Sequence, residues 1–284
     1  MLVLSLFLGG GLALLREGLD ARLGTEEEVA DTLGLPVLAR VPVTSVGRLN
    51  EVDPMREARL LEAFRVLWTN LQLVASEDPL TSVLVTSPGP EEGKSTCAMA
   101  LARVAAEQGH RVTLIEGDMR KPAFSGDDGA EFGGLARVLA ERVPFDELLE
   151  ATAVPNLFLL PAGSSDENPA NLLRVDRLEV LVGEASIWSD LVIFDSPPLS
   201  AGSDALLLAQ ATARTVLVLS SRRTQRPGAR AAVRELRRAR ANIVGVVLNE
   251  VSEAAAGYGD YYGSTRRRRR SLAAALSTPS QSAD

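Results

Sequence analysis

Short apolar stretches rich in β-branched residues recur along the chain from residue 82, and stretches with helical spacing lie between most of them. The apolar stretches occupy residues 82–86, 111–115, 157–160, 191–194, 215–220 and 243–248. The helical stretches occupy about 94–108, 134–150, 170–186, 203–211 and 227–241. Strands that are buried on both faces and joined by helices predict an α/β fold with a doubly wound, mostly parallel sheet flanked by helices. Ligands of such sheets bind beyond the carboxyl ends of the strands, so the site is expected just after Thr86, Ile115 and Phe194.

The first 80 residues have a different pattern. Thr25 and Glu28 form a capping box before a short helix that Gly34 closes, and residues 37–42 predict a brief strand. A long helix follows, in which spacings of four and three place these residues on one face: Leu60, Phe64, Leu67, Leu71 and Val74. We interpret residues 16–80 as a juxtamembrane arm, residues 81–252 as the main domain and residues 253–284 as a flexible polar tail.

Residues 1–15 carry no charge. As a helix this stretch is ~22 Å long, shorter than the ~30 Å hydrocarbon core of a bilayer. It lacks the basic start and the small-residue cleavage site of a signal peptide. Three interpretations stay open: a truncated transmembrane helix, a shallow membrane anchor and a buried helix. We favour the first, because Arg16 and Arg22 follow directly, as basic residues do on the cytoplasmic side of a membrane.

The composition excludes several classes of site. The net charge is −7, so the chain as a whole is not expected to bind nucleic acid. Cys97 is the single cysteine and His110 the single histidine, which excludes an intrachain disulfide and leaves too few ligands for a Cys/His zinc site. The arginine run 266–270 is interpreted either as a solvated tail or as a contact with anionic lipids of the inner leaflet.

The segment TSPGPEEGKST (86–96) lies between the first core strand and a helix, which is the setting of a phosphate-binding loop. Backbone N–H groups of the loop and the positive end of the helix can cradle phosphate oxygens. Lys94 can reach the β- and γ-phosphates of ATP, and the Ser95 hydroxyl can ligate Mg²⁺. The usual GxxxxGK[ST] pattern has glycine where this chain has Pro88. The sequence thus predicts a P-loop NTPase-like fold with nucleotide contacts from Ser87, Glu92, Gly93, Lys94, Ser95 and Thr96.

Carboxylates follow two other core strands. Glu116 and Asp118 come after the second strand, and Asp195 comes after the fourth. A Mg²⁺–nucleotide complex needs oxygen ligands of this kind. Asp195 is the candidate Walker B residue, and Asp118 and Asp195 are candidate metal ligands together with Ser95. Either Glu116 or Asp118 can accept a proton from an incoming hydroxyl. A lone Asp at a strand end is more often a helix cap or a turn residue. The predicted metal and catalytic roles of these carboxylates therefore depend on the presence of the P-loop beside them.

All three tyrosines of the chain lie in one short stretch, GYGDYYG, as Tyr258, Tyr261 and Tyr262. A flexible segment flanked by glycine can enter the active site of a neighbouring molecule, which a buried tyrosine cannot do. The alternative is a solvated tail in which the tyrosines are incidental. The clustering of all three favours their interpretation as phosphate acceptors.

These motifs resemble the bacterial tyrosine kinases of capsule and exopolysaccharide synthesis, over nearly the whole chain. The shared features are the P-loop ending EGKST, VTLIEGDMRKP as a second acidic motif (Walker A′), NLFLLPAG followed by NPANLL, LVIFDSPP as Walker B, GVVLNEV and the tyrosine tail. The leading segment, ending LGLPVLARVP, resembles the region after the second transmembrane helix of the associated chain-length regulators.

The resemblance implies an ATP- and Mg²⁺-dependent protein-tyrosine kinase that phosphorylates its own tail. It also implies a homo-oligomeric ring in which each tail enters the next subunit, and a membrane activator of the chain-length-determinant type, fused upstream or separate. Such a protein lies on the cytoplasmic face of the bacterial plasma membrane. Residues 81–252 are then the kinase domain, and residues 16–80 include the oligomerisation helix. The fold alone suggests Asn249 and residues 222–226 as adenine contacts.

Two positions depart from the family pattern. Glu116 stands where the family usually has the aspartate tied to activating the tyrosine, so the carboxylate lies one methylene further out. The ring-forming motif ExxRxxR reads Glu62, Arg65 and Trp68 here, and the tryptophan can instead be an apolar interface anchor. The alternative for Glu62 and Arg65 is an ordinary pair of helix neighbours.

Two other functions stay open. One is a partition- or positioning-type ATPase that uses its nucleotide as a switch. Such proteins usually carry an extra lysine near the start of the P-loop, which residues 87–90 lack, and they have no use for a tyrosine tail. The other is a weakened relative that binds ATP and regulates a polymerase or exporter. This function stays open because Glu116 replaces the family's aspartate.

Overall fold

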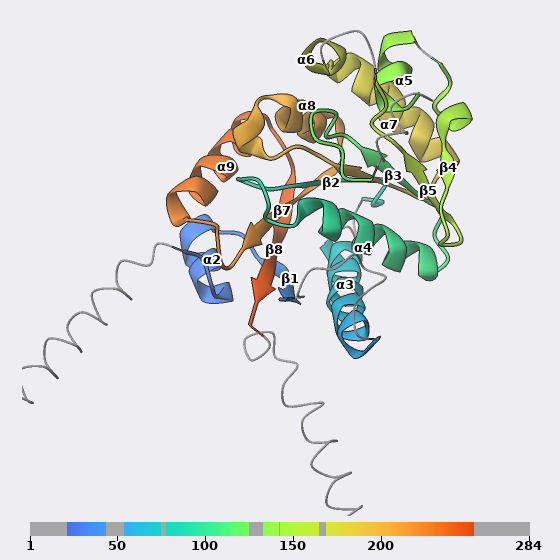
Figure 1. Cartoon of the computed structure of the whole chain (residues 1–284). Coiled ribbons are helices and arrows are strands. Elements are labelled where there is room, and N and C mark those ends of the chain that lie inside the picture. Colours follow the sequence, from blue (N-terminus) through green and yellow to red (C-terminus); the bar gives the residue numbers. More distant parts are fainter. Residues whose placement is uncertain are drawn as a thin grey trace, which may run out of the picture.

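An eight-stranded sheet forms the centre of the described structure (Figure 1). The computed structural model describes residues 22–43, 54–74, 78–124, 133–141, 143–164 and 169–252. The strand order is β1-β8-β7-β2-β6-β3-β5-β4. The strands are β1 (Val37–Pro42), β2 (Ser82–Thr86), β3 (Val112–Glu116), β4 (Glu150–Ala151), β5 (Leu157–Leu160), β6 (Leu191–Asp195), β7 (Arg214–Ser220) and β8 (Ile243–Val251). Every pairing is parallel except β4 with β5, which confirms the predicted doubly wound, mostly parallel sheet.

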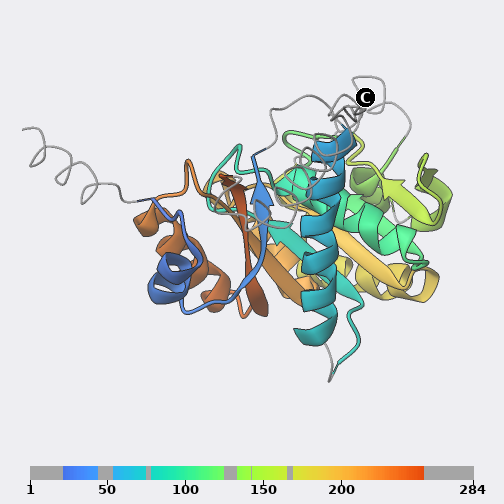
Figure 2. The same cartoon turned by 90° about the horizontal axis from the view of Figure 1, so that it is seen from below.

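Helices cover both faces of this sheet (Figure 2). On one face lie α3 (Pro54–Val74) and α4 (Lys94–Glu107), whose apolar side chains share a core with the strands. The other face has its own core. It is covered by α2 (Glu26–Leu33), α5 (Leu135–Glu141), α6 (Pro169–Leu172), α7 (Val175–Trp188), α8 (Asp204–Ala211) and α9 (Arg226–Arg238), with the 3₁₀ turns η2 (Phe145–Leu148) and η3 (Leu199–Ala201).

Two predicted helices are each divided in the structure. The helix predicted over 134–150 ends with α5, and Pro144 precedes the separate turn η2. Proline has no N–H to donate and disfavours helical backbone in the residue before it, so the helix cannot continue through this point. The helix predicted over 170–186 becomes α6 and α7, because Arg174 between them has extended backbone.

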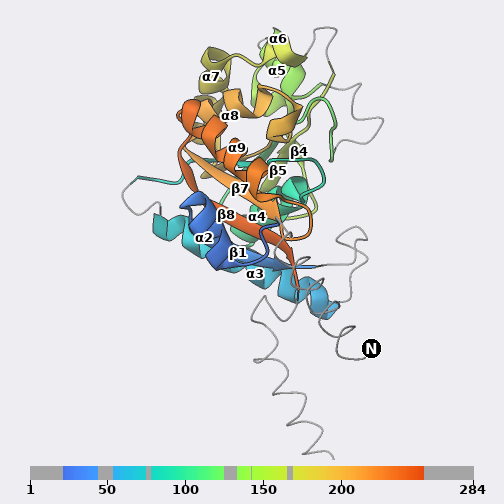
Figure 3. The ribbon, with the colours of Figure 1, turned by 90° about the vertical axis from the view of Figure 1, so that its left-hand side faces the viewer.

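The arm contributes to the same sheet as the rest of the chain. β1 is an edge strand that pairs in parallel with β8, with Val37 opposite Val246 (Figure 3). The contact is close, since a Cβ added to Gly245 would lie 2.6 Å from Leu38 Cγ. α2 packs near α9, and α3 packs over β1 and α4. Part of residues 16–80 thus completes both an edge and a face of the sheet.

The apolar face predicted for α3 is buried over most of its length. Leu60, Phe64, Leu67 and Leu71 are at most 2% exposed, which confirms the helical spacing. Val74 differs, because it ends the helix and is 47% exposed. A residue in the last turn can share the angular position of a core face and still extend beyond the surface that buries the others.

Trp68 is buried within its own chain, so the interpretation of this residue as an interface anchor is wrong. Its ring lies edge-on to His110, with the ring centroids 5.1 Å apart, and its Nε1 donates to Gln108 Oε1 at 3.1 Å. Trp68 follows Phe64 by four residues and therefore points to the core. Glu62 and Arg65 instead form a half-exposed pair at 3.1 Å on the outer side of α3.

Replacing Trp68 by alanine is expected to lower the free energy of unfolding by about 3–5 kcal/mol, because it removes a large buried side chain and leaves a cavity. Urea denaturation followed by circular dichroism measures this change. The exposed Val66 on the same helix is the control, and Val66→Ala should stay within about 0.5 kcal/mol of the parent. A Trp68 variant of normal stability would contradict the observed packing.

Several predicted features lie outside the described residues. These are the uncharged stretch 1–15, the tyrosines Tyr258, Tyr261 and Tyr262, and the arginine run 266–270. Among the helices that the structure describes, none combines the length and the apolar character needed to cross a membrane. The predictions for these segments therefore stay predictions.

Candidate active site

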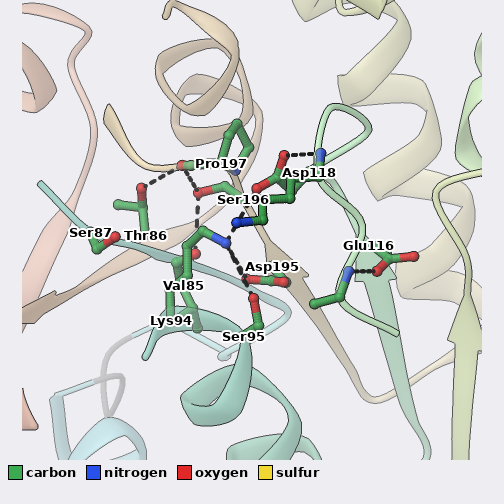
Figure 4. Close-up of polar contacts among 12 residues, drawn as sticks. Val85, Thr86, Ser87, Lys94, Ser95, Glu116, Asp118, Asp195, Ser196 and Pro197 are labelled. Atoms are coloured by element: carbon green, nitrogen blue, oxygen red, sulfur yellow. Dashed lines mark hydrogen bonds and ion pairs between the residues drawn. The ribbon is translucent and has the colours of Figure 1, made fainter. Parts of the chain in front are cut away.

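The predicted motifs meet at one edge of the sheet, where β2, β6 and β3 end side by side. The P-loop follows β2, Asp195 ends β6, and Asp118 lies two residues beyond β3. Backbone hydrogen bonds join the first two segments: Leu199 N donates to Ser87 O at 2.8 Å, and Ser200 N donates to Pro88 O at 3.1 Å. The expected position of the site, beyond the carboxyl ends of parallel strands, agrees with this geometry (Figure 4).

Gly93 forms the turn from the P-loop into α4. Its φ of 92° lies in the left-handed region, and a Cβ at this position would lie 2.1 Å from Asn249 Nδ2. Only glycine meets both conditions without strain. The turn places Lys94 and Ser95 in the first turn of α4, where the positive end of the helix favours phosphate.

Gly93→Ala is expected to lower the free energy of unfolding by at least about 1–2 kcal/mol, because alanine is strained in the left-handed region. The displaced Asn249 should also weaken nucleotide binding, measured by fluorescence titration. Gly228→Ala is the matched control, because a Cβ on Gly228 meets nothing within 4 Å. That variant should be as stable as the parent or more stable, by up to about 1 kcal/mol. Equal stability of the two variants would contradict the described turn.

Lys94 lies between the two aspartates (Figure 4). Its Nζ is 3.3 Å from Asp118 Oδ2 and 3.9 Å from Asp195 Oδ1, and it donates to Ser95 Oγ at 3.2 Å. The structure thus brings together four of the residues predicted for catalysis and metal binding. An ammonium group held by two carboxylates can turn to a phosphate once a divalent cation takes its place beside them.

Asp195 is the most deeply buried charge of this cluster. Its side chain is 0% exposed, and apart from the Ser95 hydroxyl and the Lys94 ammonium its carboxylate oxygens meet no donor among the described residues. Burial raises the pKa of Asp195 to about 7, although the charge of Lys94 lowers it in part. A buried acceptor of this kind fits a cation. Among the described residues, no group of three or more His, Cys, Asp or Glu side chains is arranged to hold a metal ion.

The loop after β3 is held in place on both sides of Asp118. Asp118 Oδ1 accepts from Lys121 N at 3.0 Å, which leaves Oδ2 facing Lys94. Arg120 Nε donates to the buried Asp204 at 2.7 Å and ties the loop to the start of α8. Neither Arg120 nor Asp204 has a role predicted from the sequence, because a contact across 84 residues has no local signal.

Glu116 is not part of the cluster around Lys94. Its Oε1 accepts from Ala123 N at 2.5 Å and Phe124 N at 2.6 Å, and its Oε2 accepts from Ala162 N at 3.0 Å. The carboxylate is fully buried and lies apart from Lys94 and Asp195 (Figure 4). Glu116 could accept a proton from tyrosine only after these contacts open, so its predicted role as a base stays a prediction.

Glu92 holds the P-loop through hydrogen bonds of its side chain and its backbone. Its Oε2 accepts from Gly89 N at 3.2 Å, its Oε1 accepts from Thr224 Oγ1 at 2.7 Å, and its backbone oxygen accepts from Asn249 Nδ2 at 2.9 Å. Burial raises the pKa of Glu92 to about 7, although the Thr224 hydroxyl lowers it in part. Both Glu92 and Asn249 therefore shape the loop, and their predicted nucleotide contacts stay untested.

The remaining predicted P-loop contacts differ in exposure. Ser87 is buried and its hydroxyl donates to Gly89 O at 2.7 Å, whereas Thr96 is exposed on the first turn of α4. Thr224, which lies within the predicted adenine segment 222–226, is also buried. Its backbone oxygen accepts from Leu23 N at 3.2 Å. The arm thus touches the residue that holds the P-loop, a link that sequence reasoning missed.

Comparison with known proteins identifies the family. The model of the CobQ/CobB/MinD/ParA nucleotide binding domain matches residues 83–261. Tyrosine-protein kinase YwqD of Bacillus subtilis is 34% identical over 206 residues, which cover 71% of this chain and 86% of that protein. The chain belongs to the bacterial tyrosine kinases. This kinase family is the one that the motifs resemble, and its nucleotide-binding domain carries the P-loop described above.

Two further relatives agree with this assignment. The kinase domain of Escherichia coli tyrosine kinase ETK superposes with a TM-score of 0.70 at 26% identity, and the match covers 78% of this chain and 94% of that domain. Tyrosine-protein kinase ptk of Acinetobacter johnsonii is 28% identical over 278 residues, which are 91% of this chain and 38% of that protein. The chain therefore spans well under half the length of this second kinase.

Proposed function

We propose that the protein is an ATP-dependent tyrosine autokinase that phosphorylates the tyrosines of its own tail. The observation that carries the proposal is the approach of Lys94 to two buried carboxylates at the end of a P-loop, in a chain of the tyrosine kinase family. Bound nucleotide would supply the phosphoryl group. Lys94 would contact its phosphates, and Ser95, Asp118 and Asp195 would hold Mg²⁺.

The path of the chain supports access of the tail to this site. β8 is parallel to β7, and β7 is parallel to β2, so β8 ends at the same edge of the sheet as the P-loop. Two strand spacings separate β8 from β2, or about 10 Å. Tyr258 is the sixth residue after Ser252, and six extended residues span at most about 20 Å. The tail therefore starts within reach of its own or a neighbouring site.

Phosphoryl transfer needs a group that accepts the tyrosine proton. Asp118 faces Lys94, whereas Glu116 first has to release three backbone donors. We therefore propose Asp118 as the acceptor in the described conformation, in which case Ser95 and Asp195 would hold Mg²⁺ without it. Comparison of Glu116→Gln with Asp118→Asn in the same phosphorylation assay distinguishes the two roles.

The proposal includes assembly and location. Phosphorylation in trans within a ring, control by a membrane activator, a place at the inner leaflet and a role in capsule or exopolysaccharide synthesis all follow from the family resemblance. The uncharged residues 1–15 and the arginine run 266–270 support a membrane setting by composition alone. No nucleic-acid partner is proposed.

Incubation of the full chain with Mg·ATP, followed by mass spectrometry of the tail, tests the central proposal. Label is expected on Tyr258, Tyr261 or Tyr262 and should be lost in the triple Phe variant. For transfer in trans, a Lys94→Met chain with an intact tail is mixed with the triple Phe chain, which has an intact site. Label on the Lys94→Met chain supports transfer between molecules.

One observation favours a second function. The three backbone donors that hold Glu116 suit a relative with a weakened kinase site that works as a nucleotide-dependent regulator. A positioning-type ATPase is the remaining alternative. Nucleotide binding or hydrolysis without phosphotyrosine, with the membrane activator present, would favour these two functions and overturn the kinase proposal.

A further inference from the structure

The segment that contains α9 is strongly basic in a chain that is acidic as a whole. Residues 222–240 carry eight arginines and one glutamate, a net charge of +7, whereas the whole chain carries −7. Charge of one sign gathered on one face of a protein attracts ligands of the opposite sign. The predicted nucleotide contacts on this segment end at residue 226, so ATP does not account for the arginines that follow.

Helical spacing places three of these arginines on the outer face of α9. Arg230, Arg234 and Arg238 follow one another at intervals of four residues, and all three are exposed. We call these three the outer arginines. The opposite face of the helix is buried against the sheet through Ala229, Ala232, Val233 and Leu236. Figures 1 and 3 show α9 beside α2 on the outside of the molecule.

The outer arginines have no counter-charge in the part of the chain that the structure describes. Their neighbour Arg226 pairs with Glu28 at 2.6 Å, whereas no outer arginine has an ion pair with a described residue. Like charges four residues apart destabilise a helix. The negative end of the helix favours Arg238 in the last turn but does not reach the other two. An anionic surface outside the chain would relieve this repulsion.

The N-terminal segment joins the folded domain beside the start of α9. Arg22 forms an antiparallel bridge with Gln225, the residue before α9. Arg22 is also the seventh residue after Leu15, and seven extended residues span at most about 25 Å. Any surface that the uncharged residues 1–15 contact therefore lies within that distance of the start of α9.

We propose that the outer arginines of α9 dock on the anionic headgroups of a membrane and so fix the side that the domain turns to it. This inference rests on the proposed place of the protein at the inner leaflet and has no part in phosphoryl transfer. The neighbouring helix α2 carries the exposed acids Glu26, Glu27 and Asp31. Anionic headgroups repel these acids, so the membrane is expected to meet the α9 side of the helix pair.

Binding of the unphosphorylated full chain to vesicles tests the contact. The vesicles are either neutral phosphatidylcholine or phosphatidylcholine with about one third anionic phosphatidylglycerol. Each basic residue near an anionic bilayer strengthens binding about fivefold, the equivalent of about 1 kcal/mol. Arg234→Gln combined with Arg238→Gln should therefore weaken binding to the anionic vesicles about 25-fold and leave binding to the neutral ones unchanged. Arg137→Gln combined with Arg174→Gln, which removes two exposed arginines elsewhere, should stay within about twofold of the parent.

Two results of this measurement would overturn the proposal. If the α9 double variant binds anionic vesicles like the parent, the arginine run 266–270 accounts for the lipid preference. If the parent binds duplex DNA more tightly than the anionic vesicles at equal phosphate concentration, and the same variant loses this binding, α9 is a nucleic-acid surface.

Proximity to the lipid gives a second measurement. The only native cysteine, Cys97, is buried, so a bimane label reports on an introduced cysteine. Ala231→Cys lies between the outer arginines, and Leu73→Cys lies on α3, across the sheet, at a position that is 66% exposed. Spin-labelled headgroups in the anionic vesicles should quench the label on α9 at least about three times as strongly as the label on α3. Equal quenching would contradict docking through α9.

Tail phosphorylation is measured on the same samples without vesicles. The α9 double variant should label at the parent rate, because the outer arginines lie outside the cluster around Lys94. Labelling of a parent whose lipid binding does not depend on α9 would reject the lipid contact alone. Lipid binding through α9 without labelling would reject the kinase proposal alone.

Discussion

Lys94→Met is expected to reduce tail phosphorylation at least about 100-fold, because it removes the cation that meets the charge developing on the transferred phosphoryl group. The fold should survive, since methionine keeps most of the aliphatic side chain and only the contacts of the Lys94 ammonium with Asp118, Asp195 and Ser95 are lost. The measurement is the initial rate of phosphotyrosine formation with saturating Mg·ATP and the membrane activator.

The control for this prediction is Arg230→Met, which removes an exposed cation from α9, outside the P-loop and the cluster around Lys94. It should phosphorylate at the parent rate. Circular dichroism and thermal unfolding of both variants exclude loss of structure as the cause. Retention of more than a tenth of the parent rate by Lys94→Met would show that another group binds the phosphates.

Asp195→Asn is expected to abolish phosphorylation and at the same time to stabilise the nucleotide-free protein at pH 8. The pKa of Asp195 is raised from 3.8 to about 7 by burial. The folded state therefore disfavours the charged form, and stability is lost as the pH rises from about 4 to about 7. A shift of about three pKa units corresponds to a loss of unfolding free energy on the order of 4 kcal/mol above pH 7. Asparagine is never charged, so the variant avoids this loss.

The sign of the pH dependence distinguishes this explanation from a general effect of the substitution. The gain in unfolding free energy of Asp195→Asn, measured by urea denaturation in EDTA, should be larger at pH 8 than at pH 5. Asp176→Asn is the matched control, because Asp176 is exposed and Arg174 lowers its pKa. That variant should gain nothing at pH 8. A destabilised Asp195→Asn protein would mean that the charged carboxylate contributes to the fold.

The parts of the site that the sequence predicts are those with a local signal. Lys94 and Ser95 follow a strand and open a helix, and Asp118 and Asp195 follow other strands of the same parallel sheet. The carboxyl ends of neighbouring parallel strands lie on the same side of the sheet, so these side chains meet whichever loops and helices connect the strands. The same reasoning gave the fold class, because buried strands that alternate with helices have few arrangements.

The features that the sequence did not reveal depend on distant partners. Trp68 is placed by Gln108 and His110, and Glu116 by the backbone near residues 123 and 162. Thr224 reaches Glu92 across 132 residues. Spacing along a helix or strand gives the direction of a side chain, but it does not identify the segment that the side chain meets. The sequence places the Glu116 carboxylate one methylene further out than the family's aspartate, whereas the structure shows that backbone N–H groups of Ala123, Phe124 and Ala162 hold it.

The pairing of β1 with β8 also has a consequence during synthesis of the protein. Val37 lies opposite Val246, so roughly 200 residues must be translated after β1 before its partner strand exists. At 5–20 residues per second this takes about 10–40 s. During that time the arm has no sheet edge to join, and the apolar side of α3 lacks part of the surface that will cover it. The arm, which leaves the ribosome before the other strands of the sheet, is therefore among the last segments to reach its native place.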